Sequence, residues 1–286
     1  MKILSPAKIN LFLQVTGKRP DGYHDLFSLM CCVSLFDTIL LEFGGRTIEI
    51  HSTHPQIPLD HTNLAHKAAA LFLAKLNTDS GVKITIEKNI PVAAGLGGGS
   101  SNAAGVLNGL NRHYGFPFTR SQLISMGLRL GADVPFFLFE KPALASGIGD
   151  KLEAYPNLPS YYVVLIFPGF GVSTAEVFQN LNLGLTNCKK KFSKSFFRKT
   201  GYDASRHLCN DLEAVTAARH PVIKSVKKQL VEHGALGALM SGSGPTVFGL
   251  FSEQDKAAAA MQVCGKTARW KCYLAEIIGP RHLVDL

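Results

Sequence analysis

The chain has 286 residues, of which 46% are hydrophobic and 18% are charged. This composition excludes a disordered chain and is typical of a globular protein with one large or two ordinary domains. The first residues lack a signal-peptide or transit-peptide pattern, and the apolar runs are far shorter than the roughly 18 residues of a membrane span. We therefore expect a cytoplasmic protein without a membrane partner.

The net charge of +9 is concentrated in one place, because residues 189–199 carry six basic and no acidic side chains. Basic and aromatic residues are interleaved there, a pattern that single-strand binders also use. A solvated loop or a cover over an anionic substrate explains the segment equally well, and we expect no nucleic-acid partner.

The six cysteines form neither a CxxC pair nor a metal-ligand spacing. We therefore expect buried, reduced thiols. Four histidines lie close together in a Pro- and Thr-containing stretch that lacks the context of a zinc site: His51, His54, His61 and His66. We expect no metal-binding cluster of protein side chains.

The first 90 residues predict strands and one helix. Residues 3–15 indicate a strand interrupted by two polar residues, Lys8 and Asn10, and a turn rich in Gly and Pro follows. Residues 26–41 are apolar and favour strands, residues 63–76 have helical spacing with Asn63 as N-cap, and residues 82–87 alternate like a half-buried strand.

Residues 91–104 are the most informative stretch, because four glycines and two serines lie between that strand and a predicted helix. Glycines let backbone N–H groups converge on one point, and a helix N-terminus adds positive charge, so the stretch predicts a phosphate site. The spacing matches neither a Walker A loop nor a dinucleotide fingerprint. We expect Ser100 or Ser101 to cap the helix.

The remaining elements are predicted from spacing and small-residue turns. Their ranges are a helix at 119–131 capped by Thr119, a strand at 161–167, a basic linker at 184–206, helices near 210–220 and 222–233, a loop at 241–246, a strand at 247–251 and a helix at 254–267. Loop-like residues 152–159 place a domain boundary there. We predict an ATP-binding domain at 1–155 and a domain contributing to substrate binding at 156–286.

Four motifs, in this order along the chain, together resemble the GHMP small-molecule kinase superfamily. They are residues 6–11 (Pro-Ala-Lys-Ile-Asn-Leu), 91–101, 131–137 (Gly-Ala-Asp-Val-Pro-Phe-Phe) and 241–246 (Ser-Gly-Ser-Gly-Pro-Thr). The resemblance implies an α+β fold with a ribosomal protein S5 domain 2-like N-terminal domain, a ferredoxin-like C-terminal domain and an active site in the cleft between them. It also implies ATP and Mg²⁺ as cofactors, in a reaction where positioning and charge neutralisation dominate.

Two further segments, residues 17–24 and 210–213, narrow the resemblance to the branch that phosphorylates a cytidine diphosphate derivative in the non-mevalonate route to isoprenoid precursors. A homoserine or mevalonate kinase is the alternative within the superfamily. We expect a monomer or a weak homodimer with small-molecule partners.

Lys8 and Asp133 are the candidate catalytic pair. Lys8 is a cation on an apolar strand, and an inward lysine needs a partner. Read alone, Asp133 is a turn residue or a helix cap; the resemblance implies that it accepts the proton of the substrate hydroxyl or orients that hydroxyl. We expect the two side chains within hydrogen-bond reach, although 125 residues separate them.

The resemblance assigns further residues to the two substrates. It implies that His24 recognises cytosine with one donor and one acceptor, that Tyr23 lines the same pocket, that Phe178 stacks on the ring, and that Asn10 binds the sugar-alcohol or diphosphate portion. It implies that the ATP site contains Asn63, Leu64, Lys88, Pro91, Gly95, Leu96, Gly97, Gly98, Gly99, Ser100 and Ser101.

Overall fold

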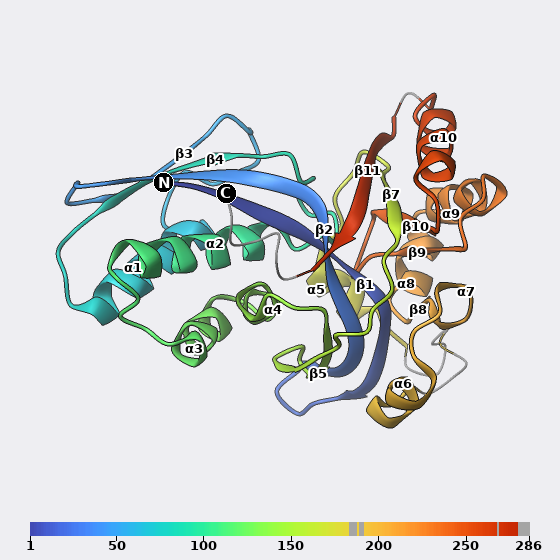
Figure 1. Cartoon of the computed structure of the whole chain (residues 1–286), viewed down its shortest axis with the longest axis horizontal. Helices are drawn as coiled ribbons and strands as arrows, with labels where there is room; N and C mark the ends of the chain where they lie inside the picture. Colours follow the sequence, from blue (N-terminus) through green and yellow to red (C-terminus); the bar gives the residue numbers. More distant parts are fainter. Residues whose placement is uncertain (183–187, 189–191, 268, 280–286) are drawn as a thin grey trace.

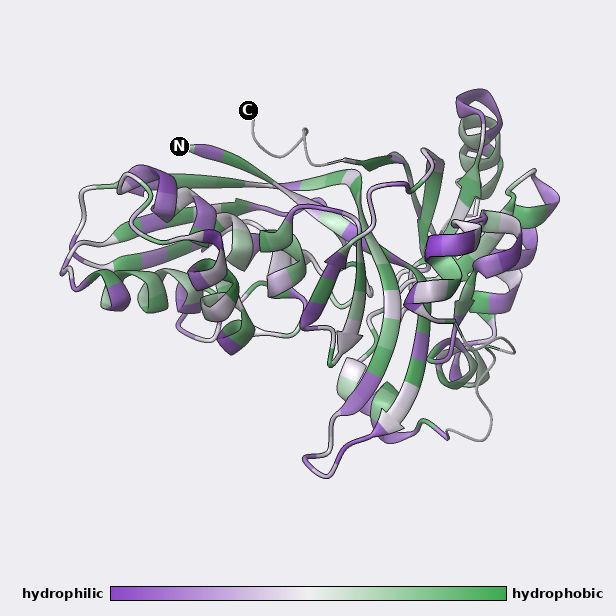
Figure 2. Ribbon diagram, turned by 60° about the horizontal axis from the view of Figure 1, so that its bottom comes forward, coloured by the Kyte–Doolittle hydropathy of each residue, from purple (hydrophilic) through white to green (hydrophobic). Residues whose placement is uncertain are grey.

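Two long antiparallel strands, β1 (Lys2–Lys18) and β2 (His24–Phe43), run through the molecule and end in the hairpin at the bottom of Figure 1. The computed structural model describes residues 1–182, 188, 192–267 and 269–279. The turn between the two strands is hydrophilic, purple in Figure 2, and lies away from the helices of the first half. The sequence predicted both strands but placed their ends several residues short.

The register of this strand pair shifts between Pro6 and Ala7 and again between Asn10 and Phe12. Such bulges bend a strand and re-aim its side chains, and they are common beside active sites. These two shifts flank Lys8 and Asn10, so both polar residues lie in an irregular part of β1.

The first half of the chain places four helices on one face of a sheet (Figure 1). The sheet continues from β2 to β4 (Val82–Glu87) and β3 (Ile48–Ser52). The core between helices and sheet is apolar, with Phe72, Ile84 and Leu107 fully buried. The helices are α1 (Leu64–Leu76), α2 (Gly98–His113), α3 (Arg120–Leu130) and α4 (Val134–Phe139), and a small hairpin of β5 (Ala143–Gly147) and β6 (Lys151–Ala154) pairs with β2.

The second half forms an antiparallel sheet in the order β11-β7-β10-β9, flanked by helices on the right of Figure 1. Its strands are β7 (Tyr162–Phe167), β9 (Gly237–Met240), β10 (Val247–Phe251) and β11 (Lys271–Ile278). Its other elements are α5 (Thr174–Gln179), α6 (Lys194–Thr200), α7 (Ala204–His207), β8 (Cys209–Asn210), α8 (Glu213–Arg219), α9 (Val222–Glu232) and α10 (Gln254–Cys264).

Strands cross between the two halves. The end of β11 pairs with β2, and β8 pairs parallel with β1. The predicted boundary at residue 155 falls between β6 and β7, and the division into two domains stays a prediction. None of the described helices is long and apolar enough to cross a membrane.

Most of the predicted helices are confirmed, but the cap of α2 is not the predicted one. Asn63 and Thr119 cap α1 and α3 through their side chains, as expected. Helix α2 instead starts at Gly98, after Gly97 in the left-handed region, and its first intrahelical bond runs from the Ser101 N–H to the Gly97 carbonyl. The prediction that Ser100 or Ser101 caps the helix was wrong, because Gly98 and Gly99 before them are already helical.

Three predicted ranges in the second half need correction. Residues 194–200 and 204–207 are helical, although 184–206 was predicted as a linker; its residues 184–187 and 189–191 lie outside the described part. The helix predicted near 210 begins at Glu213, because residues 209–210 pair with β1. The last helix ends at Cys264 and not at residue 267.

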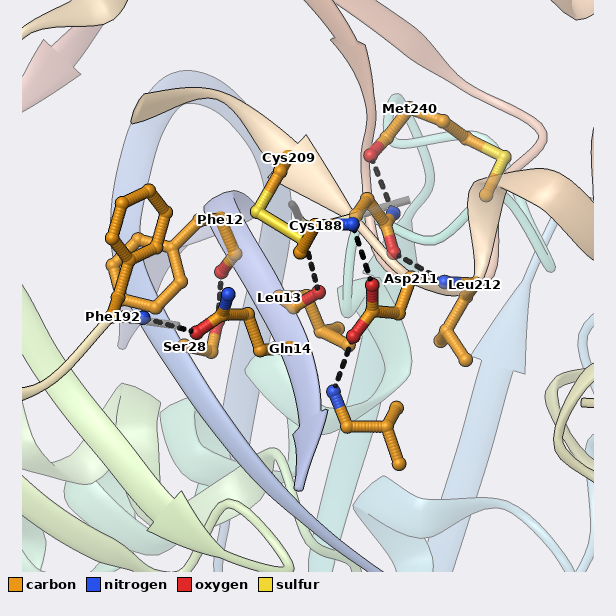
Figure 3. Close-up of a disulfide and its surroundings, with 12 residues drawn as sticks. Phe12, Leu13, Gln14, Ser28, Cys188, Phe192, Cys209, Asp211, Leu212 and Met240 are labelled. Carbon is orange, nitrogen blue, oxygen red and sulfur yellow. Dashed lines mark hydrogen bonds between the residues drawn. A yellow bond between two sulfur atoms is a disulfide. The ribbon is translucent and has the colours of Figure 1, made fainter. Parts of the chain in front are cut away.

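The prediction of six reduced thiols was wrong for two cysteines. Cys188 and Cys209 form a disulfide, with 5.5 Å between their Cα atoms. Figure 3 shows how they are held: the Cys188 N–H donates to Asp211, which also accepts from the Val15 N–H. No local spacing predicted the pair, because β8 reaches Cys188 only through long-range pairing with β1. The other four cysteines are free, and burial raises the pKa of Cys32 to about 12.

Candidate active site

One cavity of about 860 Å³ collects the polar residues that the sequence singled out. Its walls come from β1, the glycine loop, the start of α4, the helix α5 and the turn at 241–246, so both halves of the chain contribute. Predicted site residues on its lining are Lys8, Asn10, Tyr23, His24, Leu64, Lys88, Pro91, Gly95, Gly97, Gly98, Gly99, Ser100, Asp133 and Phe178.

Three other predicted residues do not line this cavity. Asn63 borders an adjoining cavity of about 190 Å³, and its side chain accepts from the Ala65 N–H and donates to the Pro58 carbonyl. Leu96 lies in the hydrophobic core. Ser101 is 2% exposed, and its buried hydroxyl has no hydrogen-bond partner in the part of the chain that the structure describes.

The glycine loop passes so close to its neighbours that larger residues do not fit. A Cβ on Gly97 would lie 3.0 Å from the side chains of Lys8 and Phe137, and one on Gly98 would lie 2.9 Å from the Lys88 ammonium. The Lys8 N–H donates to the Leu96 carbonyl at 2.9 Å, which joins the loop to β1. The first N–H groups of α2 have no carbonyl one turn before them to accept their hydrogen bonds. These free donors border the cavity, and cations lie beside them.

The turn at 241–246 packs directly on the glycine loop. The Ser241 hydroxyl donates to the Gly95 carbonyl at 2.9 Å, and a Cβ on Gly242 would lie 3.5 Å from the Lys8 ammonium. The Asn210 amide holds this turn by donating to the carbonyls of Met240 and Gly242 at 2.8 and 2.7 Å. Sequence reasoning placed Asn210 near the start of a helix and used it for the resemblance, but missed this role. The residue lies in the two-residue strand β8, which gave no signal in the sequence.

Lys8 and Asp133 come together as predicted, but at an ion-pair distance and not within the predicted hydrogen-bond reach. The Lys8 ammonium lies 3.6 Å from Asp133 Oδ2, an ion-pair distance, and donates to Asn10 Oδ1 at 2.7 Å. Asn10 in turn donates to the Ser28 hydroxyl at 2.8 Å, which donates to the Phe12 carbonyl. The Lys8 side chain is 6% exposed and that of Asp133 is 40% exposed. A buried cation is thus aimed at a carboxylate that faces the cavity.

Asp133 lies between the helices α3 and α4, because residues 134–139 are helical. Asp133 occupies the N-cap position of α4, yet its side chain makes no capping hydrogen bond. Its carboxylate is therefore not used as a helix cap.

An aromatic pair also lines the cavity. The rings of His24 and Phe178 stack with centroids 5.2 Å apart, and Tyr23 is 60% exposed beside them. Burial, with the nearby charge of Lys18, lowers the pKa of His24 from its usual value. The shift favours the neutral ring, which offers one donor and one acceptor.

Among the described residues there is no group of three or more His, Cys, Asp or Glu side chains that could hold a metal ion.

The basic segment has partners within the protein: Lys194 and Arg198 pair with Glu153 at 2.9 and 2.5 Å. Its aromatic residues pack on the core, where Phe197 stacks on Phe12 with centroids 4.8 Å apart. This packing explains the interleaved aromatic residues without a nucleic acid.

Comparisons with known proteins define the class. The family model for the N-terminal domain of GHMP kinases matches residues 63–141, and the model for the C-terminal domain of GHMP kinases matches residues 192–267. The chain belongs to the GHMP kinase family, and its two-part fold of mixed sheet and helices is the family's.

Particular relatives are close in sequence. The chain is 47% identical to the 4-diphosphocytidyl-2-C-methyl-D-erythritol kinase of Syntrophus aciditrophicus (strain SB), over 97% of this chain and 99% of the relative. It is 48% identical to the kinase of the same name from Syntrophotalea carbinolica, over 96% and 97%. A crystal structure of 4-(cytidine 5'-diphospho)-2C-methyl-D-erythritol kinase superposes with a TM-score of 0.79 at 34% identity, covering 98% of this chain and all of that one. A homoserine kinase structure from Cytophaga hutchinsonii, at 19% identity, has a TM-score of 0.73 over 98% of this chain and 94% of that one, and shows the fold alone.

Proposed function

We propose that this protein transfers the γ-phosphoryl group of ATP to the 2-hydroxyl of 4-diphosphocytidyl-2-C-methyl-D-erythritol, giving the 2-phosphate and ADP. The reaction belongs to the non-mevalonate route to isoprenoid precursors. The observation that carries the proposal is the ion pair of Lys8 and Asp133 in one cavity with both the glycine loop and the pair of His24 and Phe178. Relatives with 42–48% identity that bear this kinase's name support it.

The glycine loop and the N-terminus of α2 hold the ATP phosphates in this proposal. Lys8 faces the phosphoryl group in transfer, and Asp133 accepts the proton of the attacking hydroxyl or orients it. The hydroxyl is tertiary and hindered, so alignment by the cavity walls supplies much of the rate. Asn10, which fixes the Lys8 ammonium, also contacts the erythritol or diphosphate portion.

The residues present fit Mg²⁺ carried by ATP. Asp133 and Ser100 line the same cavity as the glycine loop. Mg²⁺ keeps several waters and takes one or two protein oxygens beside phosphate oxygens, so a carboxylate and a hydroxyl suffice. When bound, it neutralises charge on the phosphates.

The cytosine of the acceptor binds at the part of the cavity lined by His24 and Phe178. A neutral His24 matches both a donor and an acceptor on the base edge. Phe178 and Tyr23 offer aromatic faces for stacking. The cytoplasmic location and the monomeric or weakly dimeric state expected from the sequence stay predictions.

Replacement of Asp133 by Asn tests the chemistry. We expect kcat to fall by about 10²–10⁴-fold, because the amide cannot accept the hydroxyl proton, while ATP binding and the unfolding temperature change little. Asp79→Asn, a change at an exposed carboxylate outside the cavity lining, is the matched control and should leave turnover unchanged. Turnover near the normal value in the Asp133 variant would remove its proposed role.

Ligand-induced stabilisation tests the acceptor. We expect CDP or CMP to raise the unfolding temperature, and mevalonate and homoserine to leave it unchanged, because only the cytidine nucleotides fit the His24 pocket. Solved mevalonate and homoserine kinases at 14–19% identity share the fold but do not identify the acceptor. A response to mevalonate or homoserine alone would favour those kinases instead.

A further inference from the structure

Lys88 is a buried cation at the positive end of a helix. Its side chain is 3% exposed, and its ammonium lies where a Cβ on Gly98, the first residue of α2, would be 2.9 Å away. The N-terminus of a helix repels a cation, and burial adds a desolvation cost. The position is therefore unfavourable unless an anion compensates it permanently.

Asp37 of β2 is that anion. It is fully buried, and its Oδ2 accepts from the Lys88 ammonium and from the Asn102 amide, the latter at 3.0 Å. Its Oδ1 accepts from the backbone N–H groups of Asn89 and Ile90 at 2.9 Å each. Two donors on each oxygen fix the orientation of the carboxylate.

This cluster of Asp37, Lys88 and Asn102 holds both flanks of the glycine loop. Residues 89–90 directly precede the loop, and Asn102 lies in the second turn of α2, after it. Lys88 also lies 3.5 Å from Asn102 Oδ1, so within the described residues two of its three N–H groups have partners. Lys88 lines the main cavity, which leaves the third N–H for an oxygen that enters it.

We propose that Asp37 is a positioning residue for ATP: it holds the Lys88 ammonium in place at the start of α2, and Lys88 there binds the phosphates. The inference rests on the proposed function for the identity of the phosphate ligand. Asp37 does not itself touch ATP. Its contribution reaches the nucleotide through Lys88, because binding into a preorganised cation and loop avoids the cost of ordering them.

A double-mutant cycle with Asp37→Asn and Lys88→Met tests this coupling. The measurement is the Kd of a non-hydrolysable ATP analogue by calorimetry, with KM for ATP and for the acceptor beside it. We expect each single variant to weaken nucleotide binding by about 10–100-fold, the usual effect of losing a charged hydrogen bond, with the acceptor KM changed less than about twofold. The double variant should bind no worse than Lys88→Met.

Three outcomes would overturn the proposal. They are an unchanged Kd in Asp37→Asn, an unchanged Kd in Lys88→Met, and additive losses in the double variant, which would mean that Asp37 acts independently of Lys88. Asp37→Asn leaves a buried cation with a weaker partner, so it risks not folding. In that case Lys88→Met is compared with the double variant, in which neither charge of the pair is present. Equal Kd values for the two variants support the proposal. Weaker nucleotide binding by the double variant contradicts it.

A matched control separates positioning from stability. Asn111, another buried amide of α2, bonds to the backbone of Phe118 at the far end of the helix. Asn111→Ala should lower the unfolding temperature but leave the Kd for nucleotide unchanged. Because the Kd needs no acceptor, a failure of the proposed acceptor chemistry would leave this test standing.

Discussion

Gly95 meets two separate steric requirements. Its φ of +76° is in the left-handed region, and a Cβ there would overlap the Ser241 carbonyl oxygen and lie 2.9 Å from the Gly244 nitrogen. We expect Gly95→Ala to lower the free energy of unfolding by about 2–4 kcal/mol, the sum of backbone strain and overpacking. It should also lower kcat/KM at least about tenfold, because the glycine loop must move off the turn at 241–246. Urea unfolding and steady-state kinetics measure the two effects.

Gly115 is the matched control for this residue. Its φ of +75° is nearly the same, but a Cβ there meets nothing within 4 Å. Gly115→Ala should therefore cost only the left-handed strain, about 1 kcal/mol, and leave kcat/KM unchanged. Equal losses of unfolding free energy and of kcat/KM in the two variants would show that the contact between the glycine loop and the turn at 241–246 contributes to neither stability nor activity.

Single residues were predictable where their type conflicted with their surroundings. Lys8 is conspicuous on an apolar strand, and its approach to Asp133 was predicted from that position. The structure places the two groups 3.6 Å apart, an ion-pair distance that exceeds the predicted hydrogen-bond reach. Asp37 also interrupts an apolar run, at residues 26–41, but it was not singled out because nothing near it in the sequence shows its partners. Its four donors come from segments more than 50 residues away, which local sequence patterns do not reveal.

At the scale of elements, β8 depends on a covalent link. Cys209 lies in this two-residue strand, and its disulfide to Cys188 spans 21 residues of sequence. We expect Cys188→Ser combined with Cys209→Ser to lower the free energy of unfolding by about 3 kcal/mol, because the unfolded chain loses a loop constraint of this length. Urea denaturation under non-reducing conditions measures the loss.

Reduction provides the control for the same link. A dithiol reductant should destabilise the unmodified protein by a similar amount and leave the double serine variant unaffected. If the reductant does not change the unfolding midpoint of the unmodified protein, the disulfide does not contribute to its stability. The other four cysteines are already free thiols, so a reductant leaves them unchanged.

Elements were predictable from the sequence where apolar periodicity and caps agreed. Helices α1 and α3 carry both spacing and a capping residue, and α9 carries helical spacing alone; the predicted ranges of all three hold to within about two residues. The start of α2 was misplaced, since glycines carry no spacing signal of their own. The helix α6 was hidden in a basic segment, because its stability comes from Phe197 packing on Phe12 in the tertiary structure.

At the scale of the whole molecule, the two halves share one core. A single hydrophobic cluster contains Ile9 and Leu29 from the first half together with Val163, Leu165 and Phe248 from the second. The sheet path also runs from β4 through β2 and β11 to β7 without a break. A linear reading of the sequence finds a loop near residue 155 but not these contacts, since they join residues more than 100 positions apart.

Shared packing predicts that the chain unfolds in one cooperative transition. The single tryptophan, Trp270, precedes β11 and reports on the second half, whereas far-UV circular dichroism reports on both. Ile278 at the end of β11 is buried in the core of the first half, opposite Cys32 of β2. Ile278→Ala should cost about 2–4 kcal/mol and shift the urea midpoints of both signals together, because β11 holds the halves in one unit. Separate midpoints, or a shift in circular dichroism without one in fluorescence, would show instead that residues 1–155 and 156–286 unfold as independent domains.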